Sequence, residues 1–121
     1  MDNPHPFPYE RLDAWRVARE ARVMLRALMK QLPPGQYIEK READKSAGSV
    51  LRNLAEGATR RGRGEKRQHF NIANAEAAEV AASVQGWIDV EMVDTNDGYA
   101  VIRHYGRVGA MMYGLVRRHR R

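Results

Sequence analysis

The sequence contains no cysteine, so disulfide bonds and thiolate metal ligands are excluded. Aromatic residues make up only 7% of the chain. No apolar run approaches the ~18 residues that a membrane-spanning helix needs. The first eight residues contain three prolines and no apolar run, which is unlike a signal peptide. We therefore expect a soluble, cytoplasmic protein with no membrane partner, stabilised by its apolar core.

Hydrophobic residues make up 43% of the 121 residues and charged residues 30%, a balance typical of one globular domain. Prolines and glycines divide the chain into four segments, at residues 9–32, 37–58, 65–93 and 99–117. In each segment apolar residues recur at spacings of three and four, as in an amphipathic helix. Short connections make neighbouring helices antiparallel. The sequence therefore predicts an all-α, up-down-up-down four-helix bundle over residues 9–117, with a flexible tail at 1–8 and a basic tail at 118–121.

The third segment carries two apolar stripes. The first follows a heptad-like alternation through Phe70, Ala73, Ala77, Val80, Val84 and Trp87. The second consists of Ile72, Ala75, Ala78 and Ala82, and it is too apolar for a solvent-facing surface. This pattern predicts a helix that is covered on two sides, by its own bundle and by another subunit. We therefore expect a homo-oligomer, with the third or the first helix buried between subunits.

Charge is distributed unevenly along the chain, which has a net charge of +6. Residues 68–98 hold six acidic residues and no Lys or Arg, whereas residues 99–121 hold six Arg and no acidic residue. In the predicted topology the loop after the second helix and the C-terminus lie at the same end of the bundle. That end gathers nine cations, which we call the basic pole: Arg60, Arg61, Arg63, Lys66, Arg67, Arg117, Arg118, Arg120 and Arg121.

An arginine-rich cluster can bind phosphates bidentately, so the basic pole predicts binding to nucleic acid. Two alternatives stay open at this point. The same residues could contact an acidic partner protein, which would make the chain a protein-interaction scaffold, or they could be solvated ends with no partner.

Sequence motifs give no support for catalysis. The glycines at 57, 62 and 64 resemble a phosphate-binding loop, but the Lys and the Ser or Thr that such a loop needs are missing. Neither His69 nor His104 has an acidic residue three positions earlier, as a di-iron bundle requires. No serine has a plausible histidine partner. We therefore expect a non-enzymatic protein without metal or other cofactor.

Polar residues lie on one side of the second segment, next to its apolar stripe: Ser46, Ser49, Asn53 and Glu56. A position at the edge of the core allows a buried polar network with Glu76 or Glu79 of the next helix. Such a network fixes the register of two helices, because each buried polar atom needs its partner. We therefore predict a structural role for these residues.

The segment Ser49-Val-Leu-Arg-Asn53-Leu-Ala-Glu56-Gly57 is similar to the Ser-Ile-x-x-Asn-Ile-Ala-Glu-Gly block of a known family, the four-helix bundle proteins encoded within 23S rRNA intervening sequences. Leu12-Asp-Ala-Trp15 with Ala18 resembles the opening pattern of that family. Phe70-Asn-Ile72-Ala73 followed by Glu79 resembles its third-helix pattern. One departure is Ala75-Glu76, where family members usually have Gly-Ser.

Relatives of that family include the accessory variability determinant of diversity-generating retroelements. The arginine-rich loop and tail of this chain resemble that branch in their charge. The resemblance implies a homopentamer. In the retroelement branch it also implies binding to a reverse transcriptase and to nucleic acid. We therefore expect an oligomeric bundle that binds RNA, DNA or a nucleoprotein partner such as a reverse transcriptase through the basic pole.

Overall fold

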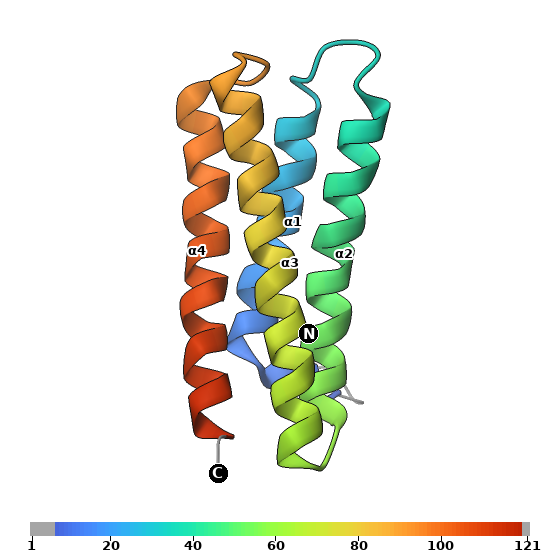
Figure 1. Ribbon diagram of the computed structural model, residues 1–121, viewed down its shortest axis with the longest axis vertical. Coiled ribbons are helices and arrows are strands. Elements are labelled where there is room, and N and C mark those ends of the chain that lie inside the picture. Colours follow the sequence, from blue (N-terminus) through green and yellow to red (C-terminus); the bar gives the residue numbers. More distant parts are fainter. Residues whose placement is uncertain (1–6, 120–121) are drawn as a thin grey trace, which may run out of the picture.

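The computed structural model describes residues 7–119, and within that range it contains α-helices, a short 3-10 helix and the turns between them. The 3-10 helix η1 spans Pro8–Arg11 and is followed by α1 at Asp13–Met29 and α2 at Tyr37–Thr59. The two remaining helices are α3 at Arg63–Asp89 and α4 at Thr95–Arg118. Figure 1 shows these four long helices side by side with alternating direction. The predicted all-α fold is therefore confirmed for the described residues.

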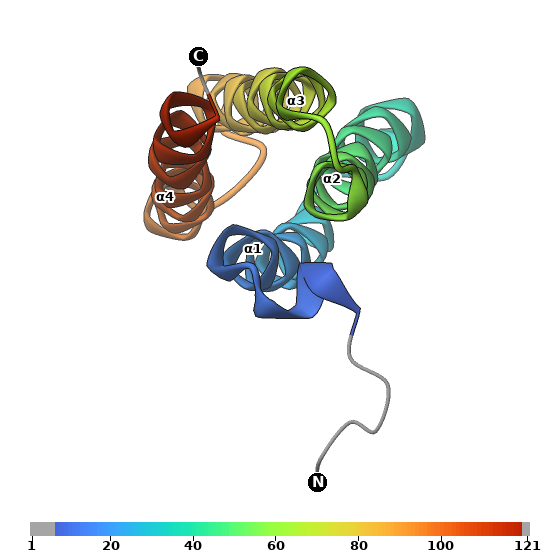
Figure 2. The same ribbon diagram turned by 90° about the horizontal axis from the view of Figure 1, so that it is seen from below.

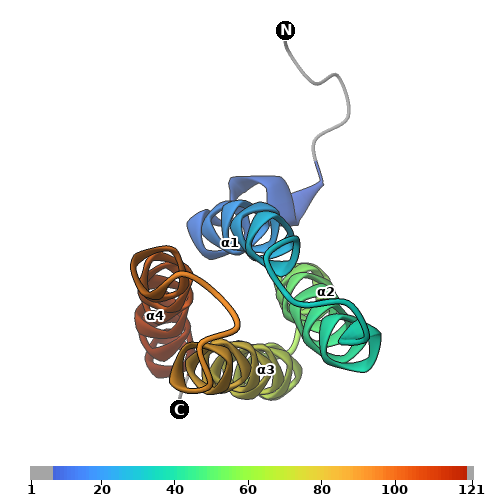
Figure 3. The same ribbon diagram turned by 90° about the horizontal axis from the view of Figure 1, so that it is seen from above.

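The helices pack in a closed square. Each helix contacts its neighbours along the chain, and α4 returns to pack against α1. Figures 2 and 3 show the square from its two ends. At the lower end in Figure 1 lie the end of α2, the start of α3 and the end of α4. The other end holds the α1–α2 and α3–α4 connections.

The core contains the apolar stripes that the sequence pattern predicts. All six heptad-like residues of α3 are buried, from Phe70 to Trp87. On α4, Tyr105, Val108 and Met112 face the same interior. Trp87 is only 2% exposed, and its indole N–H donates a hydrogen bond to Glu39 Oε2 at 3.0 Å. Trp87 is therefore buried within its own chain.

Helix boundaries differ from the sequence expectation by a few residues, most clearly in the first segment and at the α3–α4 connection. Leu12 has an extended backbone, so the first segment is broken into η1 and α1 rather than forming one helix. At the other end of the bundle α3 stops at Asp89, and Glu91 adopts a left-handed φ of 60° in the following turn. Asp94 then caps α4, because its Oδ2 accepts a hydrogen bond from the Asp97 amide at 2.9 Å.

The second stripe of α3 lies on the outside of the bundle. Ile72, Ala75, Ala78 and Ala82 are all exposed, with 39% of Ile72 accessible. This face is therefore apolar and not covered within one chain. None of the helices between residues 7 and 119 is long and apolar enough to cross a membrane.

Candidate functional site

The two cation-rich stretches of the basic pole are in direct contact. Arg67, on the first turns of α3, donates a hydrogen bond from Nη1 to the backbone carbonyl of His119 at 2.9 Å. One turn further along α3, the ring of Phe70 lies 6.0 Å from the ring of His119. The structure thus brings the α2–α3 loop and the end of α4 together, at residues 52 positions apart in sequence.

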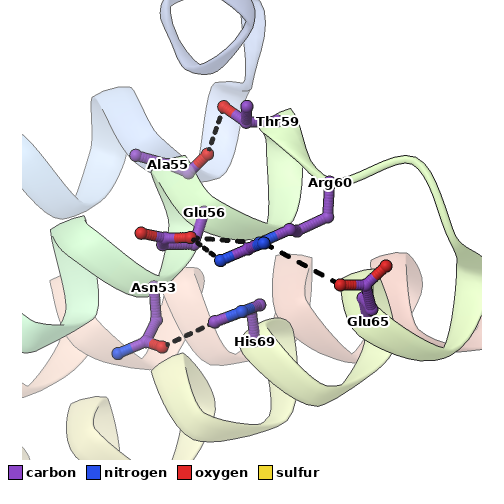
Figure 4. Close-up of polar contacts among 7 residues, drawn as sticks. All are labelled: Asn53, Ala55, Glu56, Thr59, Arg60, Glu65 and His69. Carbon is purple, nitrogen blue, oxygen red and sulfur yellow. Dashed lines mark hydrogen bonds and ion pairs between the residues drawn. The ribbon is translucent and has the colours of Figure 1, made fainter.

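Three of the cations form intramolecular contacts that build the pole. Arg60 pairs with Glu56 at 2.9 Å and approaches Glu65 at 3.9 Å, as Figure 4 shows. Lys66 Nζ donates to the carbonyls of Gly57 at 2.9 Å and Ala58 at 3.2 Å. These carbonyls lie at the C-terminal end of α2, where the helix dipole favours a cation. The charge of Arg60 is therefore partly neutralised by acidic side chains. Backbone carbonyls of the protein accept hydrogen bonds from Lys66 and Arg67.

Other cations of the pole are exposed and uncompensated. Within residues 7–119, the side chains of Arg61, Arg63 and Arg118 form no hydrogen bond or ion pair. Arg117 is also exposed, and its guanidinium lies 5.7 Å from the centroid of the Tyr113 ring. Arg120 and Arg121 lie outside the described residues. The pole therefore presents at least four guanidinium groups to solvent.

The electrostatic effect of these cations is seen at His119, the residue that caps the C-terminal end of α4. Partial burial lowers the pKa of His119, and the positive charges of Lys66, Arg118 and Arg63 lower it further. A neutral imidazole is thus favoured at the centre of the cluster. The same potential that repels a proton from His119 attracts an anion.

The polar residues of α2 do not form a single network: Ser49 and Asn53 contact each other, whereas Glu56 forms a separate ion pair. Asn53 Nδ2 donates to Ser49 Oγ at 3.1 Å and to the Ser49 carbonyl at 3.0 Å. Asn53 Oδ1 lies 3.0 Å from His69 Nδ1 of α3, so the network joins two helices (Figure 4). Glu56 turns away from it and pairs with Arg60. The Ser46 side chain forms no hydrogen bond within residues 7–119.

Glu76 and Glu79 of α3 extend this network. Polar interaction with Glu79 lowers the pKa of Glu76, and Ser49 of α2 acts in the same direction. The neighbouring Glu76 in turn raises the pKa of Glu79. The network is half-buried, since no polar or charged residue of the described chain is fully buried. The expectation of a buried network was too strong.

No group of three or more His, Asp or Glu side chains within residues 7–119 could hold a metal ion. The concentrated charge lies on exposed guanidinium groups at one end of a rigid bundle.

Comparison with known families matches residues 10–114 to the model for the 23S rRNA-intervening sequence protein. The chain belongs to this 23S rRNA-intervening sequence protein family. No curated protein matches the sequence. The family match includes the loop cations from Arg60 to Arg67 and the whole polar network, but it ends before Arg117 and Arg118. Part of the basic pole therefore lies outside the region that the chain shares with the family model.

Proposed function

We propose that this chain is a non-enzymatic, oligomeric four-helix protein that binds nucleic acid through its basic pole. One observation carries the proposal: the Arg67–His119 contact brings two cation-rich stretches together at one end of the bundle. Arg61, Arg63 and Arg118 have no acidic partner in the described chain, so their charge is available to phosphates. Arginine suits this task because its planar guanidinium binds a phosphate bidentately.

The exposed apolar stripe of α3 supports an oligomer. Ile72, Ala75, Ala78 and Ala82 form a face of small side chains that another helix can approach closely. We take the assembly to be a homopentamer, as the family resemblance implies. Five copies place five basic poles in one particle, which multiplies the phosphate contacts made with a single nucleic acid. A nucleoprotein, such as a reverse transcriptase with its bound RNA, is a partner that such a particle could engage.

Binding should be measured by fluorescence anisotropy with a short labelled RNA and a short labelled DNA, at low and at physiological salt. The test variant combines Arg61→Gln, Arg63→Gln and Arg118→Gln. A control variant combines Lys30→Gln, Lys40→Gln and Arg41→Gln, which removes the same charge at the opposite end of the bundle. The test variant should bind more weakly, and its slope of log affinity against log salt should fall by about one for each lost phosphate contact. The control should change little.

Absence of binding at low salt, or an equal loss in the control variant, would contradict the proposal. A protein-interaction scaffold is distinguished by a pull-down carried out with and without nuclease. A partner that is retained after nuclease treatment, together with no direct binding to nucleic acid, would favour the scaffold.

A further inference from the structure

Three aromatic rings lie beside the basic pole and contact one another in sequence order. The rings of Phe7 and Tyr9 are stacked, with centroids 5.7 Å apart and planes 12° from parallel. Tyr9 also contacts Trp15, at 4.5 Å between centroids. The guanidinium of Arg19 lies 5.9 Å from the Trp15 ring. Aromatic residues are few in this sequence, so three in contact at one end of the bundle is a local concentration.

Phe7 is held in place although its side chain is exposed. Its backbone amide donates to the carboxylate of Glu10, and Pro8 begins η1 directly after it. Arg16 Nε then donates to the Glu10 carbonyl at 3.1 Å, which ties η1 to α1. Phe7 nevertheless remains 59% exposed. Little conformational entropy is lost when a ligand contacts an exposed ring whose backbone is already held in place.

Phe7 and Tyr9 form one wall of a surface hollow of about 300 Å³. The other wall comes from the last three turns of α2 and includes Arg52, Ala55, Glu56 and Thr59. Glu56 is the residue that pairs with Arg60, so the hollow borders the basic pole directly. Figure 4 shows the Glu56–Arg60 pair at the end of α2. The Arg60 pairing offsets the charge of Glu56, while Arg52 adds a cation. The hollow therefore combines an aromatic wall with a nearby positive potential.

We propose that this hollow binds an unpaired nucleobase, stacked on Phe7, of a single-stranded nucleic acid whose phosphates contact the basic pole. The inference rests on the proposed function and makes it more specific. A π-face next to cations is the combination by which proteins hold single strands, because every base can stack on an aromatic ring. Bases of a duplex are already stacked and paired, so they cannot enter the hollow. The chain should therefore prefer single strands.

The test compares Phe7→Leu with the parent protein, using a labelled oligouridylate and a labelled duplex of the same length. Leucine keeps an apolar side chain but removes the π-face. Tyr37→Leu is the matched control, since Tyr37 is 68% exposed at the opposite end of the bundle. Loss of the stacking contact should weaken single-strand binding by roughly five- to 100-fold. Duplex binding should stay the same, and Tyr37→Leu should bind both probes like the parent.

A second measurement is photo-crosslinking of a 5-bromouracil strand, with the modified residue identified by mass spectrometry. Crosslinks at Phe7, Tyr9 or Trp15 support the proposal. An unchanged single-strand affinity for Phe7→Leu, or crosslinks only at the cations, overturns it while leaving the proposed function intact. A changed particle mass for Phe7→Leu also overturns it, because Phe7 would then be a subunit contact. Failure of the parent to bind any probe removes the proposed function itself.

Discussion

Phe70 packs directly over Gly57, so that a β-carbon placed on Gly57 would lie 2.5 Å from the Phe70 ring. Phe70 is 1% exposed and cannot move into solvent. The close approach of α2 and α3 therefore requires glycine at this position. Gly57 is also the last residue of the block by which the sequence resembles its family. The contact lies just inside the basic pole, next to the Gly57 carbonyl that accepts from Lys66.

The first prediction is that Gly57→Ala destabilises the fold by about 1–3 kcal/mol, the usual effect of forcing extra volume into a packed core. Urea unfolding followed by circular dichroism measures the change. Gly86→Ala is the control, because no side chain and no other element lies within 4 Å of its β-carbon position in the last turn of α3. That substitution should stabilise the protein by roughly 0.5–1 kcal/mol. Equal effects of the two substitutions would show that Phe70 does not restrict position 57.

A second prediction concerns the carboxyl pair of α3. Glu79→Gln keeps a hydrogen-bonding side chain beside Glu76 but removes the repulsion between two negative charges. Glu79 is exposed and Glu76 is half-buried, so solvent screens the repulsion and the gain in stability at pH 7 should be no more than about 0.2–0.5 kcal/mol. The raised pKa of Glu79 means that its carboxyl group takes up a proton more readily in the folded state, and the repulsion is lost as the pH falls.

Thermal unfolding at pH 7 and at pH 4 tests this sign. The variant should be more stable than the parent at pH 7 and equal to it at pH 4, where Glu79 of the parent is protonated. A variant that gains the same stability at both pH values would show that repulsion between Glu76 and Glu79 is not the cause.

The third prediction locates the subunit interface on α3. Ala78 lies in the exposed apolar stripe, so Ala78→Arg should place a charged side chain in the interface and dissociate the oligomer. Val23→Arg tests the alternative face on α1, where Val23 is 67% exposed. Ala110→Arg, at an exposed position of α4, serves as the control. Native mass spectrometry reports the particle mass. Dissociation by Val23→Arg alone would show that the interface lies on α1. Dissociation by Ala110→Arg alone would show that neither the α1 face nor the α3 face forms the interface.

The sequence predicts the core well because local periodicity determines which face of a helix is buried. Phe70 and Trp87 were identified in this way. It cannot predict that Trp87 donates to Glu39, because that contact depends on the register of helices far apart in sequence. The ion pair between Glu56 and Arg60 was predictable from the sequence, because an opposite charge stands four residues after Glu56. The sequence pattern instead placed Glu56 in the polar network.

The candidate site was predictable to a similar extent. Helix direction alone brings the loop cations to the end of α4. Which cations are engaged, such as Lys66 on the α2 carbonyls, depends on side-chain reach that the sequence does not give. The role of His69 in holding Asn53 was missed for the same reason. Phe7 and Tyr9 were assigned to a tail and to a helix start, although Pro8 followed by Glu10 is a signal for a helical turn.

The fourth prediction uses His119 as a reporter of the basic pole. Its pKa lies below the ordinary value of about 6.5 because of partial burial and the nearby charges of Lys66, Arg118 and Arg63. Arg67 also contacts its backbone. The combined variant Arg63→Gln and Arg118→Gln should therefore raise the pKa of His119. A bound nucleic acid should raise it too, because phosphates offset the same cations.

The sign of this shift fixes the pH dependence of binding. If the bound state holds a proton on His119 more readily than the free state, affinity rises as the pH falls through the interval between the two pKa values. NMR titration of the histidine Cε1 protons measures both values, with His119→Gln identifying the signal. An unmoved His119 pKa in a saturated complex would place the phosphates elsewhere, since charges bound at Arg63 and Arg118 cannot leave that imidazole unaffected.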